Sequence, residues 1–157
     1  MPRFCIPAAL ALALSGTSAT ALGRESLGMF APLVGKCFTA DVGEGGRDRH
    51  CFTALFGGKH VRDSHRVLIG GKVVYRGETT YSVDGSTVSF LYVNSMGGSG
   101  RGEAHKTGST IAFTGTMRAE PGAAQQSMAS TWSLLGSGGY EASDGRGTPV
   151  RYRPEGK

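Results

Sequence analysis

The segment KHVRDSHRVLI-GG-KVVYRGETTYSV-DG-STVSFLYVNS, residues 59–95, decides the fold. Three runs rich in β-branched and aromatic residues are joined there by two-residue turns, which is typical of β-hairpins. Gly-Gly and Asp-Gly pairs supply the positive φ that tight hairpin turns need. Links this short make successive strands run antiparallel. The segment therefore predicts a β-meander, and the same pattern continues in both directions along the chain.

Strand-like runs separated by glycine-bearing turns fill the chain from Leu33 to Arg153. The predicted strands are residues 35–41, 48–56, 59–69, 72–83, 86–95, 99–107, 110–118, 125–135, 138–143 and 147–153. No helical 3.6-residue pattern lies between them, which argues against an α/β fold. Closing the sheet removes its two raw edges. We therefore predict an all-β fold, an antiparallel up-and-down β-barrel of about eight to ten strands, with a β-sandwich as the alternative.

The N-terminus has the pattern of a secretory signal peptide. Arg3 supplies a positive charge, Ile6 to Leu14 is apolar apart from Pro7, and Ala19-Thr20-Ala21 fits the small-residue cleavage rule. The apolar stretch is too short to span a bilayer. We expect residues 1–21 to be removed, residues 22–157 to form a single domain, and the protein to be secreted or periplasmic.

The segment from Arg24 to Leu33 suits a short N-terminal lid helix, ended by Pro32. Its apolar residues Leu27, Phe30 and Leu33 would cover one end of the barrel.

Charge and composition limit the partners. The chain has 17 Lys and Arg against 12 Asp and Glu, so removal of Arg3 leaves a net charge of 16 − 12 = +4. The charges are interspersed, whereas nucleic-acid surfaces cluster them beside exposed aromatic residues. We expect no nucleic-acid partner, no membrane span, and a monomer or homodimer.

Two cysteines follow the predicted signal peptide. Cys37 and Cys51 flank a turn centred on Glu44, which is midway between them, so they would face each other in the first hairpin. Facing residues in an antiparallel pair lie close enough for a disulfide, and export favours its formation. A catalytic thiol or a metal pair is the alternative. His50 neighbours Cys51, but adjacent strand residues point to opposite faces.

The order of several short runs resembles the small calycin-type barrels of bacteria, the lipocalin-like and fatty-acid-binding-protein-like group. The runs that carry the resemblance are LVGKCF at 33–38, GKHVRDSH at 58–65, YRGETTY at 75–81 and LYVNS at 91–95. The resemblance covers residues 30–153 and implies a cup with an internal cavity. Some relatives bind haem through a late histidine, but here none follows His105, and the Gly-x-Trp-x-Gly opening is absent. We expect no cofactor.

Along a hairpin the numbers of two paired residues have a constant sum. The position of the turn therefore assigns each side chain to a face of the sheet, provided that no bulge shifts the register. A turn at Gly57-Gly58 pairs His50 with His65 and Phe52 with Asp63, and a turn at Gly70-Gly71 pairs His65 with Arg76 and Asp63 with Glu78. One face would then carry Asp63, His65, Arg76 and Glu78. The other would carry Arg62, Tyr75, Tyr81, Tyr92 and Asn94.

Neither face is cleanly apolar, so we expect some ionisable groups inside. Arg62, Tyr75, Tyr81, Tyr92 and Asn94 are the predicted ligand-binding residues, with Arg62 holding a carboxylate head. Arg62 could equally form a structural ion pair. Asp63, His65 and Glu78 are the alternative candidates for acid–base catalysis. His50 and His65 beside Asp63 could form a metal pair, but a solvated strand gives the same pattern, and no metal site is expected.

Three functions remain open. The first is an exported barrel that binds a small hydrophobic or amphipathic molecule. The second is a calycin-like enzyme, an isomerase or hydrolase, using the acid–base residues. The third is a structural envelope module with a filled core. Cavity volume discriminates between the first and the third, because ligand pockets usually enclose several hundred cubic ångströms.

Overall fold

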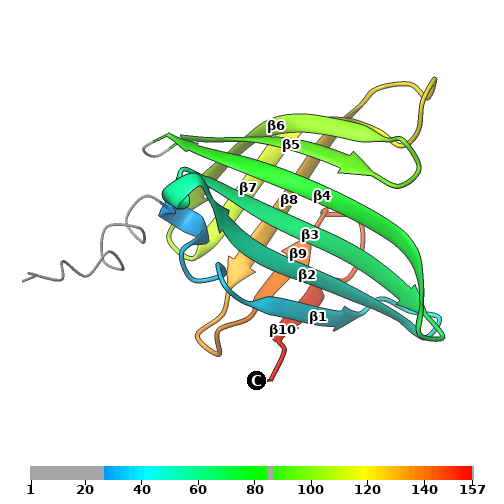
Figure 1. Cartoon of the computed structure of the whole chain (residues 1–157), viewed down its shortest axis with the longest axis horizontal. Helices are drawn as coiled ribbons and strands as arrows, with labels where there is room; N and C mark the ends of the chain where they lie inside the picture. The colour runs from blue at the N-terminus through cyan, green and yellow to red at the C-terminus, as the bar shows by residue number, and fades with distance from the viewer. Residues whose placement is uncertain (1–26, 85–86, 157) are drawn as a thin grey trace, which may run out of the picture.

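The computed structural model describes residues 27–84 and 87–156 and is a closed antiparallel β-barrel (Figure 1). Each strand pairs with its sequence neighbours, and the last strand pairs with the first through Phe38↔Pro154 and Thr39↔Arg153. The strands are β1 (Cys37–Asp41), β2 (Gly46–Leu55), β3 (His60–Ile69), β4 (Lys72–Asp84), β5 (Thr87–Asn94), β6 (Ser99–Thr107), β7 (Thr110–Arg118), β8 (Gln126–Leu134), β9 (Tyr140–Ser143) and β10 (Val150–Pro154). The predicted all-β barrel is confirmed, and the sandwich alternative is excluded.

The predicted lid is a single 3-10 turn, η1 (Gly28–Phe30), at one end of the barrel. Its residues Met29 and Phe30 are buried, as are Leu27 and Leu33 beside it. Phe30 is fully buried and stacks on Tyr81 with ring centroids 4.2 Å apart. The lid therefore covers this end by inserting an aromatic ring between the strands. The signal-peptide prediction, residues 1–21, and the first lid residues fall outside the described residues.

The half of the interior next to η1, the lid half, is packed with aromatic side chains. A chain of ring contacts runs from Phe38 through Phe52 and Tyr140 to Trp132 and Phe113 at the border with the rest of the interior, with successive centroids 4.7–6.3 Å apart. Edge-to-face and offset contacts at such distances add to the free energy gained by burial. The lid half is thus a filled core that fixes the shape of the barrel.

One sequence prediction about the faces was wrong. The register between β3 and β4 shifts between Val67 and Leu68, so His65 pairs with Gly77 and Asp63 with Thr79. Because a one-residue slip moves every side chain to the other face, Arg76 and Glu78 lie outside. The predicted β2–β3 pairing of His50 with His65 and of Phe52 with Asp63 is confirmed.

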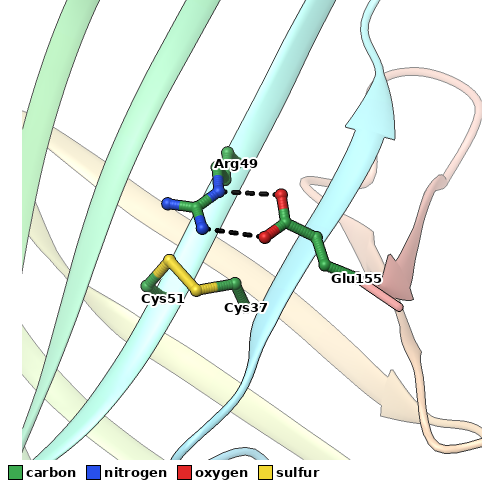
Figure 2. Close-up of a disulfide and its surroundings, with 4 residues drawn as sticks. All are labelled: Cys37, Arg49, Cys51 and Glu155. Atoms are coloured by element: carbon green, nitrogen blue, oxygen red, sulfur yellow. Dashed lines mark hydrogen bonds and ion pairs between the residues drawn. A yellow bond between two sulfur atoms is a disulfide. The ribbon is translucent and has the colours of Figure 1, made fainter. Parts of the chain in front are cut away.

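The predicted disulfide between Cys37 and Cys51 is present on the outer face (Figure 2). The two residues face each other across β1 and β2 with a Cα–Cα distance of 4.1 Å. Beside it, Arg49 donates two hydrogen bonds of 2.8 Å to the Glu155 carboxylate. This pair joins β2 to the segment that follows β10, next to the seam where the barrel closes.

Within residues 27–84 and 87–156, none of the helices has the length and apolar character needed to cross a bilayer.

Candidate functional site

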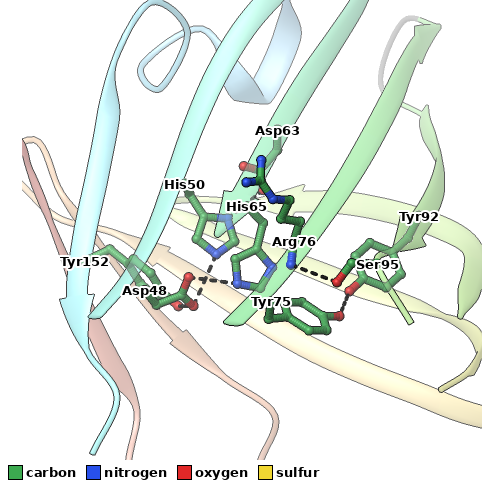
Figure 3. A network of polar contacts seen from close by, with 9 residues as sticks. All are labelled: Asp48, His50, Asp63, His65, Tyr75, Arg76, Tyr92, Ser95 and Tyr152. Atoms are coloured by element: carbon green, nitrogen blue, oxygen red, sulfur yellow. Dashed lines mark hydrogen bonds and ion pairs between the residues drawn. The ribbon is translucent and has the colours of Figure 1, made fainter. Parts of the chain in front are cut away.

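The half of the interior away from η1, the open half, carries a polar cluster built by β2 and β3. Alternation along β2 places Asp48, His50 and Phe52 inside, and alternation along β3 places Asp63 and His65 inside. The two histidines are direct cross-strand partners, and their rings stack with centroids 4.3 Å apart. The cluster is therefore fixed by two paired strands rather than by loops (Figure 3).

Both buried carboxylates contact the histidines. His50 Nδ1 lies 2.7 Å from Asp63 Oδ2, and His50 Nε2 lies 3.6 Å from Asp48 Oδ2. His65 Nε2 lies 2.8 Å from Asp48 Oδ1, although the ring geometry completes no hydrogen bond between these two atoms. Tyr152 of β10 donates a 2.8 Å hydrogen bond to Asp48 Oδ2. Within 4.0 Å, the basic partners of Asp48 and Asp63 among the described residues are histidines alone.

The pKa values of the cluster follow from these contacts. Burial lowers the pKa of His50, but the charge of Asp63 and the contacts with Asp48 outweigh it and raise that pKa to about 10. Burial raises the pKa of Asp48, but its contacts with His50 and His65 outweigh this and hold it well below its usual range. Burial, together with the Asp48 charge, raises the pKa of the Tyr152 hydroxyl. His50 is thus a cation between two carboxylates.

Two tyrosines, Tyr75 and Tyr92, lie beside His65, and the three side chains form a polar wall of the interior. The Tyr75 ring lies edge-on to His65 with centroids 5.3 Å apart, and its hydroxyl hydrogen-bonds the Tyr92 hydroxyl. A Cβ at Gly77 would lie 2.9 Å from the Tyr92 ring and 3.3 Å from His65 Nδ1. Only glycine therefore lets Tyr92 lie flat across β4 next to the histidine. Burial and the Tyr75 hydroxyl raise the pKa of Tyr92.

A small hollow lies inside the barrel beyond Tyr92. Its volume is about 110 Å³. Its lining is mostly apolar and consists of inward-facing residues of β4, β5, β7 and β8, namely Thr79, Tyr81, Phe90, Tyr92, Phe113, Met117, Met128, Ser130 and Trp132. Gly102 and Gly115 pair across β6 and β7 and let these strands approach closely, since a Cβ at Gly102 would lie 2.0 Å from the Thr114 carbonyl oxygen and 2.8 Å from the Phe90 ring.

A second hollow of about 410 Å³ adjoins the first and shares Met117, Met128 and Ser130 with it. It lies where β9 and β10 are short, so that the first half of β8 has no β9 partner. The loop residues Asp144 and Arg146 form its far wall. This larger hollow, the mouth, therefore borders the inner hollow at the side of the barrel.

The structure separates the predicted ligand-binding residues. Tyr75, Tyr81 and Tyr92 face the interior. Arg62 neighbours the buried Asp63 along β3 and alternates to the outer face, so it holds no group inside the barrel. Asn94 stabilises the β5–β6 turn, where its Oδ1 accepts hydrogen bonds from the Met96 and Gly98 amides, both 2.9 Å long.

The alternative catalytic residues do not converge either. Asp63 and His65 are inside, but Asp63 contacts His50 rather than His65. Glu78 pairs with Ser64 on the outer face and is exposed.

Sequence reasoning missed Asp48 and Tyr152. Asp48 stands two residues before His50, so the period of two already placed both on one face. Tyr152 reaches Asp48 across 104 residues of sequence. That contact depends on how β10 meets β1 when the barrel closes, and no local pattern indicates it.

Neither the scan against protein-family models nor the search of curated proteins finds a match to this chain. The ten-stranded antiparallel barrel is compatible with the calycin-like architecture expected from the sequence.

Proposed function

We propose that the protein is an exported binding barrel of calycin type that holds a small amphipathic molecule in its open half. The observation that carries the proposal is the hollow beyond Tyr92, where an apolar lining meets the polar wall of His65, Tyr75 and Tyr92. Binding pockets combine a largely apolar surface with a few polar groups that orient the ligand. Export is supported by the N-terminal sequence pattern and by the disulfide.

The size of the two hollows indicates how such a ligand would be placed. The inner hollow of about 110 Å³ is smaller than pockets that enclose a whole drug-sized molecule. The mouth of about 410 Å³ is within that range. We expect the apolar end of the ligand to enter between Met117, Met128 and Trp132, while the remainder occupies the mouth.

The polar end is expected to be neutral or cationic. The outward position of Arg62 leaves the polar wall, as far as the described residues go, without an arginine to hold a carboxylate. The buried carboxylates of Asp48 and Asp63 favour a hydrogen-bond donor or a positive charge nearby. This revises the carboxylate head group that the sequence suggested.

The intrinsic fluorescence of Trp132 tests the proposal, because Trp132 is the single tryptophan of the chain and lines the hollow. Titration with the neutral probe N-phenyl-1-naphthylamine should quench Trp132 and raise probe emission with one site per chain. Ser130→Leu, which fills the hollow, should abolish both signals. Thr131→Leu is the matched control, since Thr131 is the next residue of β8 and is exposed. The proposal fails if the folded wild-type protein takes up no probe, or if Ser130→Leu binds it as well as Thr131→Leu does.

A further inference from the structure

The strongest unexplained feature is the convergence of one carboxylate and two imidazoles at the base of the open half. One ligand atom from each of Asp48, His50 and His65 lies within 4.8 Å of the other two. Asp48 is only 6% exposed, yet its Oδ1 has no hydrogen-bond partner among the described residues, and neither has His65 Nε2. Buried polar atoms are normally hydrogen-bonded, so these two atoms, which lie 2.8 Å apart without completing a hydrogen bond, call for an explanation.

We propose that Asp48, His50 and His65 bind a divalent transition-metal ion of the Zn²⁺ type. Two imidazoles and one carboxylate are the donor set of many three-ligand zinc sites and of non-haem iron sites, and they suit borderline ions better than Ca²⁺ or Mg²⁺. Such an ion would pair both Asp48 Oδ1 and His65 Nε2. This inference goes beyond the binding function proposed above and rests on different contacts.

The separations of the donor atoms fit this assignment. With metal–ligand bonds of about 2.0–2.1 Å, donors around a tetrahedral ion lie roughly 3.3 Å apart. Asp48 Oδ1 is 2.8 Å from His65 Nε2, and one donor atom from each of the three residues lies within 4.8 Å of the other two. His50 Nε2 is 3.6 Å from the second carboxylate oxygen, Asp48 Oδ2. The two rings are nearly parallel, at 17°, so one must tilt for both nitrogens to point at a single ion.

The contacts behind these three side chains also match a metal site. Histidine ligands usually engage their second ring nitrogen with a carboxylate, which fixes the ring and strengthens the donor. His50 Nδ1 is held in this way by Asp63 at 2.7 Å, so Nε2 is the nitrogen that would bind the ion after releasing its proton. The Tyr152 hydroxyl fixes Asp48 through Oδ2. Asp63 and Tyr152 are therefore positioning residues, and neither would touch the ion.

The charges of the buried side chains also support a metal site. Two carboxylates are buried here with no lysine or arginine within 4.0 Å, among the described residues, to balance them. Buried charges are tolerated when they are paired or coordinate a metal. The flanking Arg47, Arg49 and Arg62 alternate to the outer face and leave the carboxylates to the histidines and the ion.

The test is a calorimetric titration of chelator-treated protein, made without a polyhistidine tag, with Zn²⁺. We expect one equivalent per chain. His65→Gln should weaken binding by more than about 100-fold, and Asp63→Asn, which removes only the positioning contact, by about 10- to 100-fold. His60→Gln and His105→Gln are matched controls, since both residues lie outside the cluster. They should bind Zn²⁺ as the wild type does.

Cobalt supplies a second readout that does not depend on a variant folding correctly. Co²⁺ bound by two imidazoles and a carboxylate at low coordination number should absorb visible light far more strongly than aqueous Co²⁺, and added Zn²⁺ should abolish the band. The proposal is overturned if the wild type takes up neither ion. It is also overturned if His65→Gln binds Zn²⁺ undiminished, or if the loss occurs in His60→Gln or His105→Gln, which would mark a surface site.

Discussion

The two halves of the barrel interior are built on the same strands but carry different kinds of inward-facing side chain. In the lid half, inward positions carry large apolar side chains such as Phe52 on β2 and Val61 on β3, both buried. In the open half, the same strands carry Asp48 and His65 inward, and glycines on β4 and β6 replace bulky residues. A filled core stabilises a fold, whereas buried charge beside vacant space usually costs stability. The comparison indicates that the lid half stabilises the barrel, and it agrees with the proposal that ligands bind in the open half.

The largest effect should come from the lid. Phe30→Ala removes a fully buried ring that stacks on Tyr81, and such truncations cost about 4 kcal/mol. Phe56→Ala is the matched control, because Phe56 is 79% exposed and should change little. Urea unfolding of both variants measures the difference. A loss below about 1 kcal/mol for Phe30→Ala would show that the lid does not hold the core.

In protein without bound metal, the charged groups of the open half should make the free energy of unfolding depend strongly on pH. The pKa of His50 is raised from 6.5 to about 10, so its stabilising contribution is complete below pH 6.5 and is lost as the pH rises through 10. The loss should reach roughly 3 kcal/mol by about pH 9. Asp48, whose pKa is lowered from 3.8, contributes above that pH and loses its contribution in acid.

His50→Gln should flatten the alkaline slope of this profile, measured as the unfolding free energy against pH with a chelator present. An unchanged slope in the variant would mean that other groups cause it.

The next largest loss of stability should follow removal of the disulfide. Cys37→Ser with Cys51→Ser removes a bridge that closes a loop with a sequence separation of 14, worth about 3 kcal/mol in the chain-entropy model. Reducing agent should lower the melting temperature of the wild type to that of the double variant and leave the variant unchanged. Equal melting temperatures of oxidised and reduced wild type would contradict this.

The smallest effect belongs to the outer surface. Arg49 and Glu155 form an ion pair joined by two hydrogen bonds. Both side chains are about one-third exposed, and water and salt weaken such pairs. Glu155→Gln should cost less than about 1 kcal/mol at low salt and almost nothing at high salt. Thermal melts at both salt concentrations check this. A larger loss that persists at high salt would show that this contact holds the β1–β10 seam.

The sequence allowed the fold to be predicted because its signals are local. Turn pairs such as Gly70-Gly71 define hairpins, and Cys37 and Cys51 are equidistant from Glu44. The candidate site was predicted only in part, since the bulge after Val67 leaves no mark in composition and moves Glu78 and Arg76 outside. The Tyr152–Asp48 contact requires barrel closure and depends on all ten strands together.

The most direct test of the contrast between the halves is a crystal structure under xenon pressure, because xenon enters apolar cavities that are truly vacant. The barrel described here predicts xenon in the hollow between Phe90, Phe113 and Met117, and none around Phe38 and Tyr140. Xenon around Phe38 and Tyr140, or a β1 that does not pair with β10, would contradict it.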